Sequence, residues 1–270
     1  MTFTPSAVRA LRCPICQARF ELTGGALRCA ERHSYDLAKQ GYVNLLGAGT
    51  GDNKDMVTAR SEFLAAGHYR PLADLIASRV PAHGLIVDAG TGTGYYLAAA
   101  LEKSEAVGLG LDTSTAALRR AARAHPDIAA VVWDLWRPWP VESGAADVIL
   151  NIFAPRNPAE CARVLRPGGT LLVVTPTSEH LAELRAHVGI LAVEEDKLVR
   201  LDLALSPYFS PASRDGLTVA LDLSPDDVRR VVHMGPNAYH ADAAELAAIT
   251  DSVAVTASFV LSAYRSLATS

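Results

Sequence analysis

The sequence predicts an α/β fold in which a mostly parallel, doubly wound sheet follows a small N-terminal zinc-binding module. Apolar strands alternate with helix-forming runs from residue 85 to residue 175, which is typical of a parallel sheet with helices on both faces. Four metal-ligating side chains are clustered ahead of that alternation, between residues 13 and 33. Half of the 270 residues are hydrophobic, which is enough for one large domain and a small one.

Charge and cysteine usage narrow the class of protein. The net charge of −4 argues mildly against a large nucleic-acid footprint but leaves room for a local basic cleft. The first residues have no signal-peptide pattern, and no apolar run approaches 18 residues. We therefore expect a cytoplasmic protein that does not enter a membrane and whose cysteines are reduced, so that clustered cysteines bind metal.

The N-terminal segment, residues 1–46, has the ligand spacing of a structural zinc site. The ligands are Cys13, Cys16, Cys29 and His33, in a C-x2-C-x12-C-x3-H pattern. Three thiolates and one imidazole complete a tetrahedral shell and leave no open position for chemistry. A module this small needs such a metal to stay folded. Phe20–Leu22 and Ala26–Arg28 are predicted strands of a hairpin that bends at Gly24 and Gly25.

Residues 47–84 are predicted to form a glycine-rich loop followed by two helices. Asp52 or Asn53 is suited to cap a helix over Lys54–Ala65, whose apolar residues recur every three or four positions. Pro71 begins a second helix that runs to Ser78. These elements precede the main domain, residues 85–270, and we expect them to cover its ligand site.

The segment from Leu85 to Tyr95 predicts a strand, a glycine turn and a helix. The P-loop pattern is excluded because no Lys-Ser/Thr pair follows the last glycine, and the glycine spacing differs from G-x-G-x-x-G. The pattern D-x-G-x-G-x-G resembles motif I of class I S-adenosylmethionine (SAM) methyltransferases. A bare glycine-rich turn is the alternative. The resemblance implies a SAM site formed by Asp88, Ala89, Gly90, Thr91, Gly92, Gly94 and Tyr95.

The next strands end in polar residues. The predicted strands are Ala106–Leu111, Ala129–Trp133, Ala146–Leu150 and Thr170–Thr175, with helices over Ser114–Ala124 and Pro158–Leu165. Ligands of such sheets bind beyond the carboxyl ends of the strands. Asp112, next to Thr113, is suited to the two ribose hydroxyls, or else to stabilising the next helix. Asp134 is suited to an adenine amino group with Leu135 or Trp133 beside the ring, or else to a turn.

After Thr175 the pattern changes to longer elements. The sequence predicts a helix over Ser178–Val188, strands over Lys197–Leu205 and Gly216–Leu223, helices from Ser224 to Val232 and over Ala243–Ile249, and a closing strand over Val253–Tyr264. An antiparallel strand pair at the end of the sheet fits the class I methyltransferase plan.

Taken together, the motifs resemble the RlmA family of 23S rRNA guanine-N1 methyltransferases, including its Gram-positive branch with tylosin-resistance enzymes. The resemblance covers nearly the whole chain. Its motifs are the four zinc ligands, Tyr35–Leu46, Met56–Arg60, Phe63–Tyr69, Asp88–Gly94, Phe153–Pro158 and Met234–Pro236. It implies methyl transfer from SAM to an rRNA hairpin that the zinc module helps to recognise. It also implies that His68 and Tyr69 line the SAM site.

The resemblance places the acceptor at Asn151–Pro155. Phe153 is suited to stack on a ring that Asn151 and Pro155 hold, although these residues also suit a plain strand-to-helix turn. His233 stands where the Gram-positive pattern has glycine, and Tyr239 also departs from it. A histidine there is suited to act as general base, or else is a hydrogen-bonded histidine without a catalytic part.

Two acceptors remain open at the level of sequence. An rRNA hairpin predicts a basic surface made of Arg9, Arg12, Arg19, Arg28, Arg32, Lys39, Lys54 and Arg60. The acidic net charge and the two departures leave open a small aromatic substrate instead, since relatives of this family in actinomycetes include enzymes that methylate indole rings of tryptophan-containing cyclic dipeptides. A non-catalytic SAM-binding protein is a third reading, and the oligomeric state is open, a homodimer included.

Overall fold

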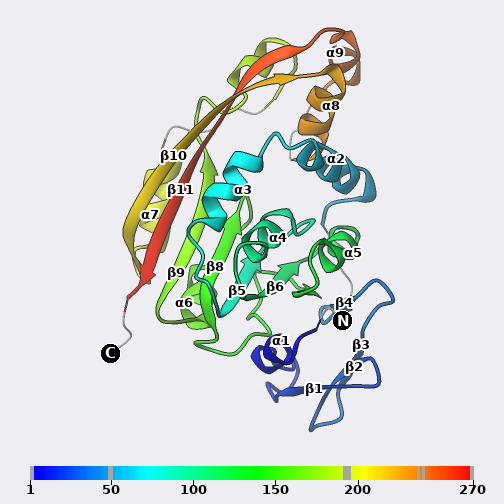
Figure 1. The fold of residues 1–270 in the computed structure, drawn as a ribbon, viewed down its shortest axis with the longest axis vertical. Helices are drawn as coiled ribbons and strands as arrows, with labels where there is room; N and C mark the ends of the chain where they lie inside the picture. The colour runs from blue at the N-terminus through cyan, green and yellow to red at the C-terminus, as the bar shows by residue number, and fades with distance from the viewer. Residues whose placement is uncertain (1–2, 48–50, 191–195, 236–237, 239–240, 268–270) are drawn as a thin grey trace.

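The computed structural model describes residues 3–47, 51–190, 196–235, 238 and 241–267. It has a small sheet at the N-terminal end and a large eight-stranded sheet that organises the rest of the chain (Figure 1). The small sheet is β1 (Phe20–Thr23), β2 (Ala26–Cys29) and β3 (Ser34–Asp36). The large sheet contains β4 (Tyr42–Asn44), β5 (Leu85–Ala89), β6 (Val107–Asp112), β7 (Ile128–Val132), β8 (Ala146–Ile152), β9 (Leu165–Pro176), β10 (Phe209–Leu223) and β11 (Val253–Ser266).

The order of the large sheet is β10-β11-β9-β8-β5-β6-β7-β4. The strands from β9 to β4 pair in parallel, whereas β11 pairs antiparallel with both β9 and β10. Strand order reverses at β5, which lies between β8 and β6, and such a reversal is where doubly wound sheets bind their ligands. The prediction of a mostly parallel sheet that ends in an antiparallel pair is confirmed.

Helices cover both faces of the large sheet. The helices are α1 (Pro5–Ala10), α2 (Lys54–Ala65), α3 (Arg70–Ala77), α4 (Tyr95–Leu101), α5 (Thr115–Ala124), α6 (Pro158–Val164), η1 (Ala182–Ala186, a 3-10 turn), α7 (Lys197–Leu205), α8 (Pro225–His233) and α9 (Ala243–Ala248). One core joins the sheet to α3, α4, α5 and α8, and the other joins it to α1, α6 and α7. Adjacent strand residues alternate between the cores, as Ile86 and Val87 do.

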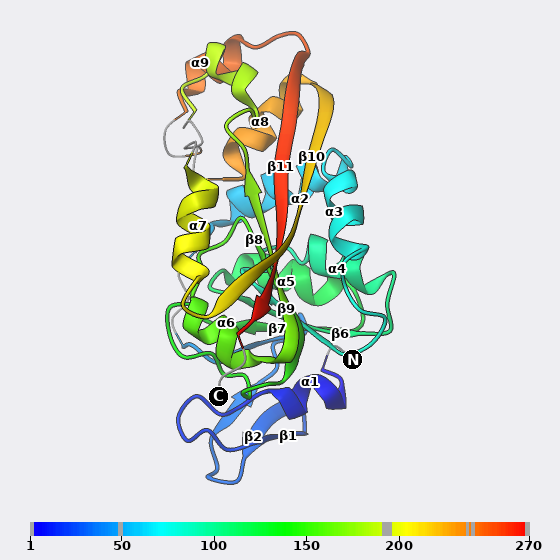
Figure 2. The same ribbon diagram turned by 90° about the vertical axis from the view of Figure 1, so that its left-hand side faces the viewer.

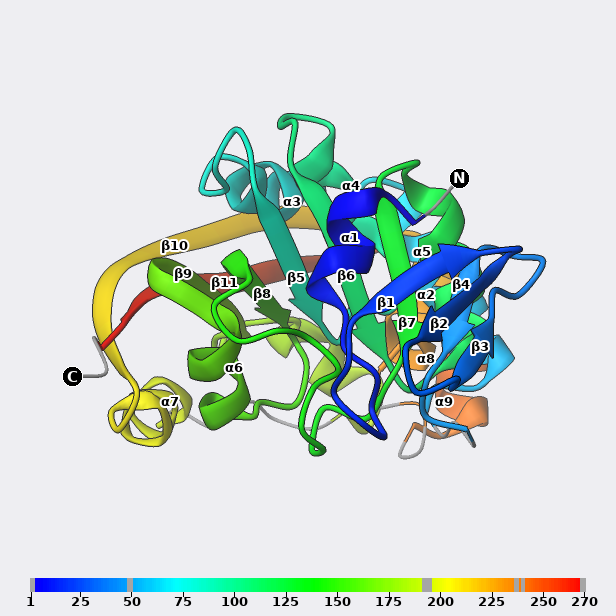
Figure 3. The ribbon, with the colours of Figure 1, turned by 90° about the horizontal axis from the view of Figure 1, so that it is seen from below.

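The zinc module lies at the lower end of the molecule in Figure 1 and faces the viewer in Figure 3, and backbone contacts tie it to the main domain. Leu11 forms an antiparallel bridge with Val141, and the Arg12 amide donates to the Pro140 carbonyl at 2.9 Å. The hairpin predicted within the module is confirmed, because β1 and β2 pair across Gly24 and Gly25, which both have positive φ. Strand β4 lies within the range assigned to this module but pairs with β7 at the edge of the large sheet.

Strands β10 and β11 form a long ribbon that rises beyond the rest of the sheet (Figure 2). Their pairing starts at Leu223 and Val253, so the chain between these residues, which carries α8 and α9, begins and ends at one place. Burial alternates along β10, which leaves one side of the ribbon exposed. The ribbon therefore holds α8 above the sheet.

One predicted strand is wrong. Lys197–Leu205 is the helix α7, although the alternation of leucine with other residues favoured a strand. Leu201 and Leu205 are buried four residues apart on one side, while Leu203 between them is 67% exposed. Helical spacing therefore decides which leucines enter the core. The partner of β11 in the antiparallel pair is β10 instead.

The helix predicted over Ser178–Val188 is present only as the short turn η1. Side chains of this segment bind β11 and compete with a helix: Glu183 accepts hydrogen bonds from Thr256, and His180 accepts one from the Ser258 amide. Leu181 has φ of 51°, which ends helical geometry at that point. Among the described residues, no helix is long and apolar enough to cross a membrane.

Candidate active site

The glycine turn joins β5 to α4, as predicted. Gly90, Gly92 and Gly94 have φ of 91°, 53° and 79°, values that side chains other than glycine rarely adopt. At Gly94 a Cβ would also lie 2.9 Å from the Cα of Ala121 in α5. The turn therefore needs glycine both for its backbone conformation and for the close approach of two helices.

Asp88 is buried beneath this turn, at the end of β5. It is 2% exposed, and its Oδ1 has no hydrogen-bond partner among the described residues. Burial, opposed by a contact with the Thr91 side chain and helped by the nearby Asp112 carboxylate, raises the pKa of Asp88 to about 7. An under-bonded buried carboxylate next to a glycine turn is a receptor for a cationic or hydrogen-bond-donating ligand group.

Asp112 ends the neighbouring strand β6, where the sequence placed it. Its Oδ2 accepts from the Gly92 amide and its Oδ1 from the Ser114 amide, both at 2.8 Å. Burial raises the pKa of Asp112, and these two backbone hydrogen bonds oppose that shift. Asp112 thus orders the glycine turn as well as the start of α5, and the second lone pair of each oxygen can still accept from a ligand.

Asn151, in β8, connects the glycine turn to the predicted acceptor region. Its side-chain amide nitrogen donates to the Ala89 carbonyl at 3.2 Å and to the Pro155 carbonyl at 2.9 Å. The side chain is buried, and its Oδ1 has no partner within the described part of the chain. The structure therefore brings Asn151 and Asp88 to the same edge of the sheet, each with one unused acceptor oxygen.

Phe153 follows two residues later and is 45% exposed. Its φ of 55° is unusual for a residue other than glycine and marks a strained turn. Its ring lies 6.3 Å from that of Tyr96 and 5.6 Å from that of Phe259. An exposed aromatic ring held in this way at the carboxyl edge of the sheet provides a surface for stacking a planar acceptor.

The aromatic cluster behind Phe153 includes residues that sequence reasoning missed. Tyr69, which was predicted, is 2% exposed, and its hydroxyl lies 3.2 Å from Nε2 of His180. His180 and Phe259 were missed because they come from a turn and from a strand far along the chain. Tyr96 was also missed. Burial raises its pKa, the nearby Tyr69 and Asp88 raise it further, and the Arg60 guanidinium opposes the rise.

Tyr95 faces the outer side of α4 instead. It lines a groove of about 320 Å³ with residues of α2, α3, α4 and α5, among them Arg70 and Glu102. No signal in the sequence distinguishes the two adjacent tyrosines, because helix α4 starts at Tyr95 and its rotation decides which ring points inward.

Helix α2 lies over the glycine turn through Arg60. Its Nη2 lies 2.6 Å from Oδ2 of Asp52 and donates to the Met234 carbonyl at 2.5 Å, and a Cβ on Gly92 would lie 3.3 Å from its Nη1. Arg60 is 25% exposed, and its guanidinium is engaged by the ion pair and the carbonyl, so its predicted part in a basic surface stays a prediction. The residue joins α2, the end of α8 and the glycine turn.

Arg12, another of the predicted basic residues, is buried away from any RNA surface. It is 7% exposed, forms an ion pair with Glu142 and donates to the carbonyls of Arg9 and Leu11 at 2.7 Å. Arg12 therefore fastens the zinc module to the main domain. Arg9, Arg19, Arg28, Arg32, Lys39 and Lys54 remain exposed.

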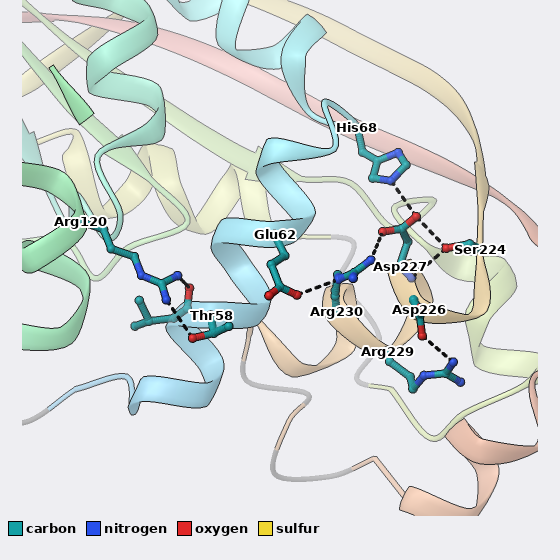
Figure 4. Close-up of polar contacts among 10 residues, drawn as sticks. Thr58, Glu62, His68, Arg120, Ser224, Asp226, Asp227, Arg229 and Arg230 are labelled. Carbon is teal, nitrogen blue, oxygen red and sulfur yellow. Dashed lines mark hydrogen bonds and ion pairs between the residues drawn. The ribbon is translucent and has the colours of Figure 1, made fainter. Parts of the chain in front are cut away.

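Helices α2 and α8 pack on one another, and we call this pair the cap (Figure 4). Arg230 lies 3.0 Å from both Glu62 of α2 and Asp227 of its own helix. His68 points toward Asp227, with 3.3 Å between Nε2 and Oδ2. His68 thus has its charged partner in α8, and its assignment to the SAM site stays a prediction.

The contacts of the remaining predicted residues are mostly with the protein backbone and neighbouring loops. The carboxylate of Asp134 accepts from the Trp136 amide at 3.0 Å, and Leu135 lies 3.8 Å from the position of a Cβ on Gly90. Thr113 adjoins the loop that leads into α2, since its Oγ1 would lie 2.6 Å from a Cβ on Gly51. His233 is exposed at the end of α8, and Tyr239 lies outside the described residues. Ligand contacts of all these residues stay predictions.

The four predicted metal ligands converge in the zinc module. Their ligand atoms lie within 4.8 Å of one another. Nδ1 of His33 is 3.5 Å from the sulfur of Cys13 and 3.4 Å from that of Cys29, and the sulfurs of Cys16 and Cys29 are 3.6 Å apart. A tetrahedral zinc ion with Zn–S bonds of about 2.3 Å needs edges of roughly this length. The cluster fits one structural zinc ion.

Comparisons with known proteins agree with this geometry. Residues 11–50 match the family model described as the RlmA N-terminal zinc ribbon, and residues 86–169 match a methyltransferase domain. A Streptomyces fradiae protein named 23S rRNA (guanine(748)-N(1))-methyltransferase is 48% identical over 90% of both chains. A Micromonospora griseorubida protein, named as a candidate 23S rRNA (guanine-N1)-methyltransferase, is 44% identical over 97% of this chain and 99% of its own.

Solved structures share the fold at low identity. The complex between the Haloferax volcanii Trm112 methyltransferase activator and a methyltransferase contains a chain that is 19% identical, with a TM-score of 0.56 over 81% of this chain and 100% of that chain. The family models and the cysteine-histidine cluster confirm the two functional parts predicted from the sequence, a zinc module and a SAM-dependent methyltransferase domain.

Proposed function

This chain belongs to the RlmA family of 23S rRNA (guanine-N1)-methyltransferases, and from that premise we propose that it methylates N1 of a guanine in a 23S rRNA hairpin. The observation that carries the proposal is the similarity of nearly the whole chain to two relatives with this named activity, the zinc ribbon included. The exposed Phe153 ring at the mouth of a SAM-type site supports a planar acceptor. An rRNA substrate would place the protein in the cytoplasm.

The residues of the site fit SAM, which supplies a methyl group already activated by its sulfonium. Asp88 would hold the ammonium of the methionine end, because its buried Oδ1 lacks a partner. Asp112 would accept from the ribose hydroxyls, and Leu135 would lie beside the adenine. The protein then contributes mainly proximity and orientation, as methyl transfer requires.

On the acceptor side, Phe153 would stack on the guanine, and Oδ1 of Asn151 would accept a hydrogen bond from its Watson–Crick edge. The N1 proton has to leave as the methyl arrives, so a base or an ordered water is needed. His233 is the candidate base from the sequence. Its exposed position at the end of α8 means that it can reach the guanine only if α8 or the substrate brings the two together.

The comparisons give no support to the second acceptor class, an indole ring in a small molecule. The two relatives named above both carry rRNA guanine-N1 methyltransferase names over at least nine-tenths of this chain. The departures at His233 and Tyr239 alone do not favour it.

A direct assay tests the proposal. SAM with a tritiated methyl group is offered with a 23S rRNA hairpin transcript and, in parallel, with tryptophan cyclodipeptides. We expect label in the RNA and a reverse-transcription stop at one guanine, because an N1-methyl group blocks its Watson–Crick edge. Replacing that guanine by adenine in the transcript is the matched control. Label only in the cyclodipeptide, or in neither substrate, would overturn the proposal.

A further inference from the structure

Trp136 is the exposed tryptophan of this chain. It is 67% exposed, whereas Trp133 and Trp139, on either side of it, are 5% and 2% exposed. Tryptophan side chains are highly buried on average, as Trp133 and Trp139 are here. Trp136 also follows Asp134 and Leu135, so it lies at the carboxyl edge of the sheet on which the SAM site is built.

The turn that carries Trp136 is held firmly. The Trp136 amide donates to Oδ1 of Asp134 at 3.0 Å, and the Arg137 amide donates to the Asp134 carbonyl at 3.0 Å. The Leu135 carbonyl accepts from the indole of Trp139 at 3.0 Å and from the Asn157 side chain at 3.1 Å. The exposed ring is thus presented on a fixed support, which lowers the entropy lost when a partner binds.

This turn also bridges the two parts of the protein that an RNA hairpin would have to contact. At one end, the Pro140 carbonyl accepts from the Arg12 amide at the start of the zinc ribbon. At the other, the Leu135 carbonyl binds Asn157, which caps α6 two residues after Pro155 of the acceptor turn. A substrate that reaches from the zinc ribbon to the acceptor turn therefore passes beside Trp136.

We propose that Trp136 stacks on an unpaired base of the RNA substrate, next to the guanine that is methylated, while Arg137 contacts the adjoining phosphate. The inference rests on the proposed rRNA substrate and adds a residue that selects the structure around the target. Exposed aromatic rings recognise single-stranded bases by stacking. The Arg137 side chain is 61% exposed, and its ion pair with Asp134, from Nε to Oδ2, is long at 3.8 Å, so its two terminal nitrogens can be offered to a phosphate.

The test compares hairpin binding by Trp136→Ala and Arg137→Ala with that by the original chain. Stacking on one base predicts that Trp136→Ala raises the Kd for the hairpin about 5- to 100-fold without changing the slope of log Kd against log salt. Arg137→Ala should reduce that slope by about one, as expected when one phosphate contact is lost. Leu203→Ala is the matched control, because Leu203 is equally exposed but lies on α7.

A second measurement identifies the partner as a base. Unpaired nucleotides next to the target guanine are replaced one at a time by abasic sites, and binding is measured with both chains. At one position, the abasic substitution should weaken binding by the original chain and leave binding by Trp136→Ala unchanged. If Trp136→Ala binds every hairpin as the original chain does, the inference is wrong. If it also loses SAM affinity, Trp136 has a structural role and the inference is again wrong.

The two proposals fail separately. If the original chain does not methylate the hairpin at all, the proposed function fails, whatever the variants do. If it methylates the hairpin and Trp136→Ala has an unchanged KM for RNA, only the stacking role fails. Should the original chain ignore RNA while Trp136→Ala abolishes binding to another protein, the ring belongs to a protein interface instead, which also overturns the inference.

Discussion

The hydroxyl of Tyr69 lies 3.2 Å from Nε2 of His180, and the other partner of the imidazole decides which of the two donates. Nδ1 of His180 accepts from the Ser258 amide, so the ring carries its hydrogen on Nε2 and donates it to the Tyr69 oxygen. The hydrogen of Tyr69 is then free to be donated elsewhere. Burial lowers the pKa of His180 to about 4, so the ring is neutral at pH 7.

The pH dependence of stability follows from this pair. Because the folded-state pKa of His180 is depressed from 6.5 to about 4, its contribution to stability is full above pH 6.5 and is lost as pH falls toward 4. Over this pH range the free energy of unfolding should fall by on the order of 3 kcal/mol. His180→Gln keeps an acceptor and a donor but cannot titrate. Urea unfolding at pH 7 and pH 4.5 should show a smaller acid loss for the variant, and an equal loss would contradict the assignment.

SAM binding should strengthen as pH rises through about 7, where Asp88 ionises. Only the carboxylate form attracts an ammonium, and below that pH the affinity should fall by up to tenfold per unit. The folding stability of the SAM-free protein depends on pH in the opposite direction. Because the pKa of Asp88 is raised in the folded state, this stability falls as pH rises from 3.8 toward 7. Calorimetric titration with SAM from pH 5.5 to 7.5 measures the change in affinity. Asp88→Asn should bind weakly and with a flat profile over the same range.

Gly94→Ala should destabilise the domain by at least about 2 kcal/mol, because it adds a Cβ 2.9 Å from the Ala121 backbone at a φ of 79°. Gly216→Ala is the matched control, since nothing lies within 4 Å of its Cβ position. Thermal unfolding of both variants compares them. Equal melting temperatures would show that α4 and α5 can separate at no cost.

Loss of zinc should unfold the N-terminal zinc module while SAM binding by the main domain persists. Cys16→Ala removes one of four ligands, and we expect the hairpin affinity to fall more than tenfold with the SAM Kd within about threefold of the original. Cys161→Ala is the control, because this buried cysteine lies on α6, outside the cluster, and the variant should retain one zinc per chain. Elemental analysis gives the metal content. An unchanged RNA affinity in Cys16→Ala would contradict the role of the zinc module in binding RNA.

Arg60→Met should loosen the cap. The substitution keeps much of the aliphatic chain but removes the contacts with Asp52 and the Met234 carbonyl, so the end of α8 is no longer held over the glycine turn. We expect the SAM Kd to rise about tenfold, which equals about 1.4 kcal/mol, and amide exchange of residues 225–234 to accelerate. Lys54→Met, an exposed cation at the start of α2, should do neither.

The sequence predicted the parts of the site that local patterns encode. Asp88 and Asp112 stand at strand ends, and the zinc ligands have a defined spacing, so their convergence follows from local rules. Arg60 and Arg12 were assigned to an exposed surface because a lone arginine gives no sign of its partner, and their partners here include a carbonyl and an acid far along the chain. His180 and Phe259 meet Tyr69 only through the antiparallel end of the sheet. The leucines of α7 recur at spacings that suit both a strand and a helix, and packing alone decided between the two.

The ribbon of β10 and β11 has a consequence for how this family can diversify. Leu223 pairs with Val253, so the segment between them leaves and re-enters the sheet at one point. Its length can therefore change without shifting the register of either strand, provided that the contacts of α8 with Arg60, Glu62 and His68 are kept. We expect that grafting residues 224–252 from a relative leaves the pairing of β10 with β11 intact, so that any change in SAM affinity or substrate preference can be assigned to the grafted segment.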